Sequence, residues 1–343
     1  MRKLLGSAAA LMALAAQPAA ADAVGDFYHG KTVQFLNAAT PGGGYDTYAR
    51  TMLPFLTRHI PGNPTLVVQN MPGAGGVVLG NYLYNIAPKD GLAIALLNNT
   101  VPFEPMYQNK QAKFDAAQLN WLGSPSQETA LLTIWHTVPV SSIEEARTHP
   151  LVLGASGVNS TPAFYARVEN AVLGTQIRLI AGYPGQTESL LAMEKGENDG
   201  YGSAFWSSLK ATKPDWIRDK KIKFLVQFGA APNPELKDVP FAPSITKNEA
   251  DKQLAELASG QLAIGRPLVA PPGVPADRLA ALEKAVLDTL KDPEFLAQCE
   301  KAHLECDSPV TGAETAALLK RLYGAPEPIV ARLRKIYDAG SEK

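Results

Sequence analysis

The sequence predicts an α/β protein of two lobes, each with a central sheet flanked by helices, hinged by crossing strands. Three observations predict this class. Strand-like and helix-like segments alternate through the first third of the chain, the alternation starts again near residue 123, and a last strand and helices follow a proline-rich loop at residues 230–243. Such alternation is typical of parallel sheets with right-handed crossovers. A chain of 343 residues, 46% hydrophobic, is long enough for two cores.

The N-terminal residues predict an export signal over residues 1–23. Arg2 and Lys3 precede an apolar run from Leu4 to Ala16, and small residues follow at 19–21, which matches the pattern of a cleaved signal peptide. The alternative is a membrane-anchoring or amphipathic helix, but the run is shorter than the about 20 residues that span a bilayer. We therefore expect the mature chain to be soluble in the periplasm.

The charge of the mature chain disfavours a nucleic-acid partner. Cleavage after residue 21 removes two basic residues and leaves 30 basic against 33 acidic ones. The mature protein would therefore carry a net charge near −3, without the basic surface that nucleic acids require.

The first lobe is expected to comprise residues 24–122 and 244–343. Apolar runs rich in β-branched residues predict strands, and apolar residues at helical spacing predict helices between them. The strands are predicted at 32–39, 65–69 and 93–97, and the helices at 47–59 and 77–86. The returning chain is predicted to add a strand at 262–270 and helices at 276–291, 293–302 and 312–336.

The second lobe is expected to comprise residues 123–243, with the crossings between the lobes near Gly123 and Pro243. Its strands are predicted at 130–136, 151–155, 177–181, 200–204 and 223–227. Its helices are predicted at 142–147, 162–173 and 186–195.

Four turns follow predicted strands and precede predicted helices, two in each lobe. They lie at residues 41–46, 71–76, 155–161 and 182–187, and we call them the cleft turns. Glycine lets backbone N–H groups approach a ligand, and a helix N-terminus favours an anion. Because ligands bind beyond the carboxyl ends of parallel strands, the cleft turns predict a ligand site between two closing lobes.

The two cysteines, Cys299 and Cys306, are predicted to form a disulfide, because an exported protein meets an oxidising environment. The alternative is two free thiols.

Enzyme motifs are absent from the sequence. It contains no G-x-S-x-G, H-E-x-x-H, C-x-x-C or P-loop pattern, and its five histidines are scattered. A dinucleotide site would need a third glycine where Val78 stands, after Gly73 and Gly75. We therefore expect a protein that is not an enzyme and holds neither a cofactor nor a metal; an exported dinucleotide-type enzyme is the weaker alternative.

Several segments in order resemble the Bug (TctC-like) family of periplasmic solute receptors, which serve tripartite tricarboxylate transporters. They are PGGGYD, VVQNMPGAGG, APKDG, ASGVNST, GYPGQTESLLAM and VAPPGVP, and the similarity covers essentially the whole mature chain. The resemblance implies a periplasmic-binding-protein fold that captures a small organic carboxylate, with one, two or three carboxyl groups, in the cleft between the lobes. It also implies delivery to a membrane permease with a large and a small subunit. We expect a monomer. A periplasmic sensor that feeds a two-component system is the alternative.

The resemblance also implies which residues hold the carboxylate, through backbone amides, hydroxyls and ordered water. On this chain they are Gly43, Gly44, Tyr45, Asp46, Thr47, Ser156, Gly157, Asn159, Ser160 and Thr161. The other cleft turns and a possible aromatic wall add Gly75, Pro184, Gly185 and Phe205 to the predicted ligand-binding residues. Asp46 either recognises an amino or hydroxyl group or caps the following helix, and Tyr45, Phe205 and Trp206 either line the cleft or pack in the core.

This chain departs from the usual family pattern at three places. Met71 stands where family members commonly have arginine, Ala38–Thr40 replaces a Pro-Phe pair, and Tyr201–Trp206 replaces an aspartate-containing stretch. With one cation fewer near the site, the sequence favours a mono- or dicarboxylate over a tricarboxylate.

Overall fold

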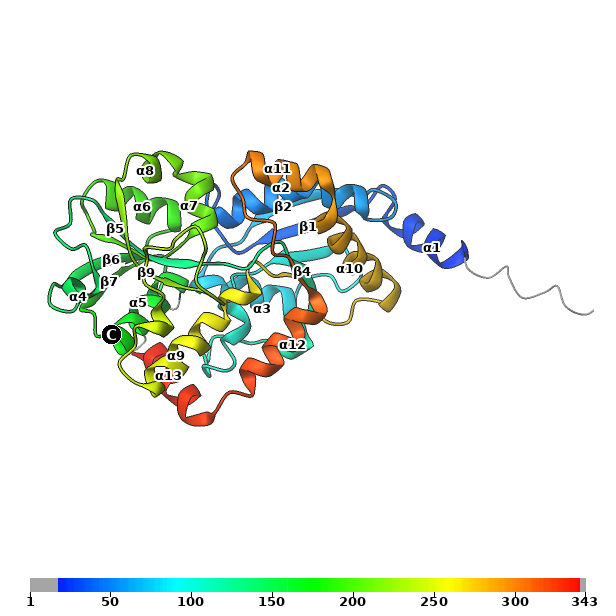
Figure 1. Cartoon of the computed structure of the whole chain (residues 1–343). Coiled ribbons are helices and arrows are strands. Elements are labelled where there is room, and N and C mark those ends of the chain that lie inside the picture. The colour runs from blue at the N-terminus through cyan, green and yellow to red at the C-terminus, as the bar shows by residue number, and fades with distance from the viewer. Residues whose placement is uncertain (1–17, 159, 340–343) are drawn as a thin grey trace, which may run out of the picture.

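The computed structural model describes residues 18–158 and 160–339 and contains two mixed sheets flanked by helices (Figure 1). The predicted fold class is confirmed. The predicted disulfide partners, Cys299 and Cys306, are bonded in the structure.

The first sheet has six strands in the order β11-β4-β10-β3-β1-β2. These strands are β1 (Thr32–Asn37), β2 (Thr65–Asn70), β3 (Ala93–Leu96), β4 (Asn120–Ser124), β10 (Leu268–Ala270) and β11 (Val310–Thr311). The helices of this part are α1 (Pro18–Tyr28), α2 (Gly44–His59), α3 (Val77–Asn85), α10 (Ala276–Lys291), α11 (Pro293–Lys301) and α12 (Gly312–Tyr323). As predicted, β1 pairs in parallel with β2 and β3.

The second sheet has five strands in the order β7-β6-β8-β5-β9. They are β5 (Ala130–Trp135), β6 (Leu151–Ala155), β7 (Ile177–Ala181), β8 (Gly200–Phe205) and β9 (Ile222–Phe228). The associated helices are α4 (Ile143–Ala146), α5 (Thr161–Leu173), α6 (Gln186–Glu194), α7 (Trp206–Thr212) and α8 (Pro214–Arg218).

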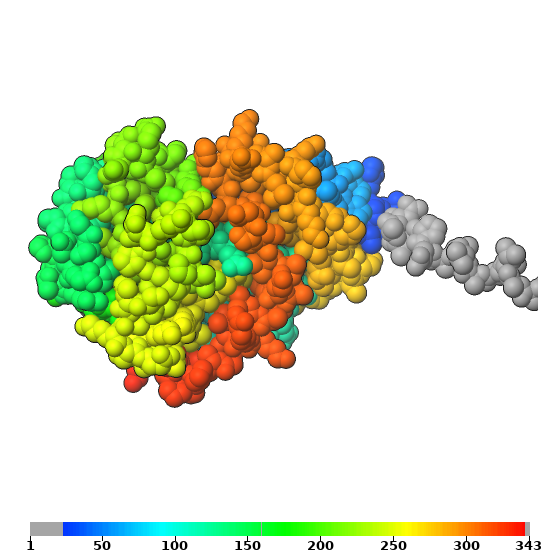
Figure 2. All heavy atoms as spheres, in the orientation of Figure 1, coloured from blue at the N-terminus to red at the C-terminus, as the bar shows by residue number. Residues whose placement is uncertain are grey.

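Two late helices, α9 (Glu249–Gly260) and α13 (Glu327–Asp338), pack against α5 and against each other. Figure 2 shows the yellow segment that contains α9 beside the red C-terminal segment. Both helices fall within the residues expected for the first lobe, yet they cover a helix of the second sheet. The C-terminal part of the chain therefore joins the two sheets from one side.

Three details of the sequence prediction are wrong. Neither sheet is all-parallel, because β10 runs antiparallel to β3 and β4, and β5 runs antiparallel to β8 and β9. The strand predicted at 262–270 is only β10, because Leu262–Ile264 forms a 3-10 turn and Pro267 lacks a ladder donor. The helix predicted at 312–336 is divided by Gly324–Pro326 into α12 and α13.

Two chain segments connect the two sheets, and parts of them lie against each other. One is short and runs from β4 to β5 at residues 124–130. The other runs from β9 to β10, contains α9 and enters β10 at residues 265–267. The Glu128 N–H donates to the Leu262 carbonyl at 2.9 Å, and the Arg266 N–H donates to Ser124 Oγ at 2.8 Å. Gly123 stands in β4 directly before the first of these segments, and Pro243 stands in a 3-10 turn (Ala242–Ser244) that precedes α9.

Gly265 is required where the crossings touch. Its φ is +65°, a conformation that other residues rarely adopt, and a Cβ there would lie 1.6 Å from the Ser126 carbonyl oxygen. Only glycine lets the two crossing segments approach this closely.

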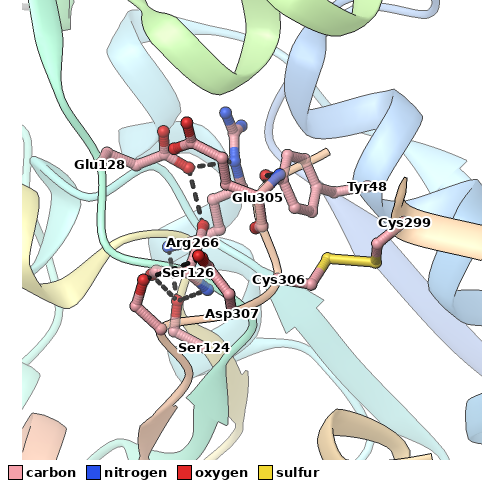
Figure 3. Close-up of a disulfide and its surroundings, with 10 residues drawn as sticks. Tyr48, Ser124, Ser126, Glu128, Arg266, Cys299, Glu305, Cys306 and Asp307 are labelled. Carbon is pink, nitrogen blue, oxygen red and sulfur yellow. Dashed lines mark hydrogen bonds and ion pairs between the residues drawn. A yellow bond between two sulfur atoms is a disulfide. The ribbon is translucent and has the colours of Figure 1, made fainter. Parts of the chain in front are cut away.

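The Cys299–Cys306 disulfide closes a short loop at the end of α11, with 6.2 Å between the two Cα atoms (Figure 3). Glu305 in this loop donates its N–H to Tyr48 Oη of α2 at 2.9 Å, and its carboxylate lies 2.8 Å from Lys210 Nζ of α7. The disulfide therefore holds a loop that contacts helices from both parts of the molecule.

We predict that replacing both cysteines with alanine lowers the free energy of unfolding by about 2.5 kcal/mol. The loss is expected because the disulfide restricts the unfolded chain, and this restriction has about that free-energy value for a loop of this length. Urea unfolding of the exported protein measures the loss. Thiol titration of the unreduced wild-type protein should find no reactive cysteine, and two reactive thiols would contradict the prediction.

Candidate ligand-binding site

A cavity of about 120 Å³ lies between the carboxyl-end turns of the two sheets. All four cleft turns contribute to its wall. Ten predicted ligand-binding residues line it: Gly43, Gly44, Tyr45, Gly75, Ser156, Ser160, Thr161, Pro184, Gly185 and Phe205. That any of them touches a ligand remains a prediction.

The other predicted residues are placed differently. Asp46 and Gly157 stand next to lining residues and Thr47 two positions after Tyr45, but these three do not line the cavity, and Asn159 lies outside the described residues. Sequence reasoning missed Thr40, Asn98, Gln186, Tyr201, Ser203 and Ser208, which also line it. Gln186 lies inside the fourth cleft turn and Thr40 directly precedes the first, so counting every residue of each turn and its neighbour would have included both. Tyr201 and Ser203 stand in the stretch that departs from the family pattern, and Asn98 and Ser208 carry no local signal.

The cleft turns of the two sheets are in close contact. A Cβ at Gly185 would lie 2.0 Å from Thr40 Oγ1, and one at Gly157 would lie 4.0 Å from the Gly75 nitrogen. The structure thus has a closed arrangement, in which turns from both sheets cover the cavity.

Four helices begin at the cavity, and none has a side-chain cap. The residues at the N-cap positions of α2, α3, α5 and α6 are Gly43, Gly76, Ser160 and Gly185. Side chains cap α4, α9, α11 and α12, whereas α7, α8, α10 and α13 also begin without a side-chain cap. Because the first N–H groups of a helix have no partner within it, N-termini without side-chain caps place donors and partial positive charge at the cavity wall. At α3 the Val77 N–H already donates to the Ala74 carbonyl of the preceding turn.

No charged side chain is among the residues that line the cavity, within the part of the chain that the structure describes. Donors and acceptors there come from the backbone and from hydroxyl and amide side chains such as Asn98, Ser156 and Gln186. The site can therefore hold an anion through dipoles and hydrogen bonds, without a formal cation in contact.

Asp46 organises the first cleft turn from behind. Its carboxylate accepts hydrogen bonds from the Gly42 N–H at 3.0 Å, Arg50 Nε at 2.8 Å and Asn70 Nδ2 at 2.9 Å. Burial opposes ionisation, but these hydrogen bonds outweigh it and hold the pKa of Asp46 below its usual range. Asp46 is not an N-cap, because α2 already begins at Gly44.

A fully buried ion pair between Arg266 and Glu128 lies behind the cavity (Figure 3). Arg266 Nε donates to Glu128 Oε1 at 2.6 Å, and the same oxygen accepts from Ser126 Oγ at 2.8 Å. Glu128 Oε2 accepts from Ser207 Oγ at 2.7 Å. Burial disfavours the charged guanidinium, but Glu128 offsets this and the pKa of Arg266 stays above its usual range.

Aromatic rings separate this ion pair from the cavity. The Arg266 guanidinium carbon lies 4.5 Å from the ring centre of Tyr45, 4.2 Å from that of Tyr48 and 5.3 Å from that of Phe205. Tyr45 Oη also accepts a hydrogen bond from the Asn99 N–H at 3.1 Å, and burial raises the pKa of Tyr45 to about 12. Tyr45 and Phe205 thus line the cavity on one side and contact the guanidinium as well. Trp206 does not line the cavity; its Nε1 donates to Glu235 Oε2 at 2.7 Å.

One family model matches this chain. The model of the tripartite tricarboxylate transporter family receptor matches residues 57–313. A comparison with curated protein sequences found no match. Within the described residues, no helix combines the length and apolar character needed to cross a membrane.

Solved structures of similar fold cover nearly the whole chain. Rpa4515 of R. palustris with adipate has 19% identity and a TM-score of 0.68, covering 91% of this chain and 97% of its own. MatC (Rpa3494) from Rhodopseudomonas palustris with bound malate has 17% identity and a TM-score of 0.69, and the match covers 90% of this chain and 99% of MatC. The periplasmic binding protein BugD has 18% identity and a TM-score of 0.69, and the match covers 91% of this chain and 98% of BugD. At these identities the likeness establishes the fold.

We predict that Asp46→Asn lowers the free energy of unfolding at pH 7 by about 1–3 kcal/mol, because the variant loses charge-assisted hydrogen bonds. The folded-state pKa of Asp46 is depressed, so its contribution is present above the unfolded value near 3.8 and is lost as the pH falls through the folded value. Denaturant unfolding at pH 7 and pH 3 should show the difference from wild type shrinking on acidification.

The exposed Asp26 provides the matched control, since Asp26→Asn should leave the free energy of unfolding at pH 7 within about 0.5 kcal/mol of wild type. A stability difference for Asp46→Asn that stays constant between the two pH values would contradict the assignment.

Proposed function

Because the chain belongs to the tripartite tricarboxylate transporter family of receptors, we propose that its cavity binds a small organic carboxylate for delivery to a membrane permease. The observation that carries the proposal is the convergence of four helix N-termini without side-chain caps on a cavity with an uncharged wall. Unpaired N–H groups are donors only, so they suit a group that is only an acceptor. An ionised carboxylate is such a group.

The uncharged wall of the cavity favours an acid with few negative charges. Among the described residues, no cation lines the wall to offset several negative charges on one ligand. We therefore propose a mono- or dicarboxylate, and the dicarboxylates named with Rpa4515 and MatC, adipate and malate, support that choice.

The remaining parts of the proposal concern location and partners. We propose that residues 1–23 direct export to the periplasm, and residues 1–17 of this segment lie outside the described structure. We further propose a monomeric binding protein, rather than an enzyme, that closes residues 123–243 against the rest of the mature chain. Its partner would be a permease with a large and a small subunit.

Thermal unfolding with added acids tests the proposed ligand class. Ligand that binds only the folded protein stabilises it by RT ln(1 + [L]/Kd), about 2.7 kcal/mol when the ligand is at 100 times Kd. We expect at least one of succinate, malate, adipate or citrate to raise the melting temperature by several degrees, with citrate the weakest. A shift with glucose or Mg²⁺ and none with any acid would overturn the proposal.

A variant that prevents closure of the cleft tests the same proposal, with a second glycine variant as its control. The backbone of Gly185 is extended, so Gly185→Ala adds no backbone strain, but its Cβ would overlap Thr40 Oγ1 across the cleft. The variant should lose most of the acid-induced shift while the protein without ligand melts near the wild-type temperature. Gly25→Ala, whose Cβ would meet only ordinary contacts at 3.8 Å, should retain the shift.

A further inference from the structure

Two neighbouring serines on α7 contact the buried arginine behind the cavity. Arg266 Nη2 lies 3.1 Å from Ser207 Oγ and 2.8 Å from Ser208 Oγ. Both serines are buried, with 0% and 1% of their surface exposed. A guanidinium can only donate hydrogen bonds, so both hydroxyl oxygens accept from Arg266.

The two hydroxyl groups differ in where their own hydrogen goes. Ser207 Oγ donates to Glu128 Oε2 at 2.7 Å, so its one hydrogen is used. Ser208 Oγ has Arg266 as its only hydrogen-bond partner among the residues that the structure describes. A hydroxyl group has one hydrogen to donate besides its acceptor sites, and that of Ser208 is therefore free for a ligand.

Ser208 also faces a different environment from Ser207. Ser208 lines the cavity and Ser207 does not. A Cβ at Gly44 would lie only 1.9 Å from Ser208 Oγ, which places this hydroxyl directly against the first turn of α2. The hydroxyl thus adjoins the unpaired N–H groups of that turn, although α2 covers the first sheet and α7 follows β8 of the second.

We propose that the Ser208 hydroxyl donates a hydrogen bond to the carboxylate of the bound acid and that Arg266 holds it in position to do so. This inference rests on the proposed function. The positive charge of Arg266 strengthens the Ser208 O–H as a donor without itself touching the acid. The carboxylate then joins N–H groups of α2 to a hydroxyl of α7, so that binding favours the closed arrangement. Ser208 is a specificity-determining residue, and Arg266 is a positioning residue.

Isothermal titration with malate, succinate and adipate tests the proposal on the full-length mature protein. Ser208→Ala should weaken the binding of each acid that the wild type binds by about tenfold or more, the usual effect of losing a hydrogen bond to a charged group. The melting temperature without ligand should stay close to that of wild type. Ser208→Cys keeps the side-chain shape with a weaker donor, and its dissociation constant should fall between those of wild type and Ser208→Ala.

Ser207→Ala is the matched control from the same helical turn. Because it removes a hydrogen bond to Glu128, it should lower the melting temperature more than Ser208→Ala does, and weaken binding less. Wild-type affinity in both Ser208 variants, or equal losses of affinity in Ser207→Ala and Ser208→Ala, would overturn the inference and leave the proposed function intact. A wild-type protein that binds no acid would overturn the proposed function, and this inference with it.

Discussion

The buried ion pair of Arg266 and Glu128 holds together the parts of the protein that meet at the cavity. Both side chains are 0% exposed, and each belongs to one of the two segments that cross between the sheets. Removing one partner of such a pair leaves an unpaired buried charge, which typically costs about 3–5 kcal/mol. Here the pair is embedded in further hydrogen bonds from Ser126, Ser207 and Ser208. The relative position of the crossings, α2 and α7 therefore depends on it.

This arrangement separates charge from the ligand site. The guanidinium of Arg266 is neutralised by Glu128 and lies against Tyr45 and Phe205, while the wall presents backbone N–H groups and hydroxyls. An arginine in direct contact would have to lose its hydration when the ligand binds, whereas preorganised dipoles avoid most of that cost. The close approach of Gly185 to Thr40 and of Gly44 to Ser208 brings segments associated with the two sheets into contact at the cavity wall.

Much of the fold was predictable because its signals are local. Apolar periodicity located β1, β6, β7 and α10 to within a few residues, and the glycine-rich segments marked the turns that line the cavity. The ion pair was not predictable, since Glu128 and Arg266 lie 138 residues apart and neither stands in a recognisable motif. Ser208 was missed for the same reason, and the sequence left Asp46 between ligand recognition and helix capping because its partner Asn70 stands in another strand.

The central claim is that an uncharged wall in front of a neutralised arginine holds the carboxylate. A crystal structure of the protein with malate tests it most directly. The account predicts a malate carboxylate within hydrogen-bond distance of N–H groups in the first turn of α2 and of Ser208 Oγ, with Arg266 still bonded to Glu128. A carboxylate bonded directly to the Arg266 guanidinium, or malate bound outside the cavity, would contradict it.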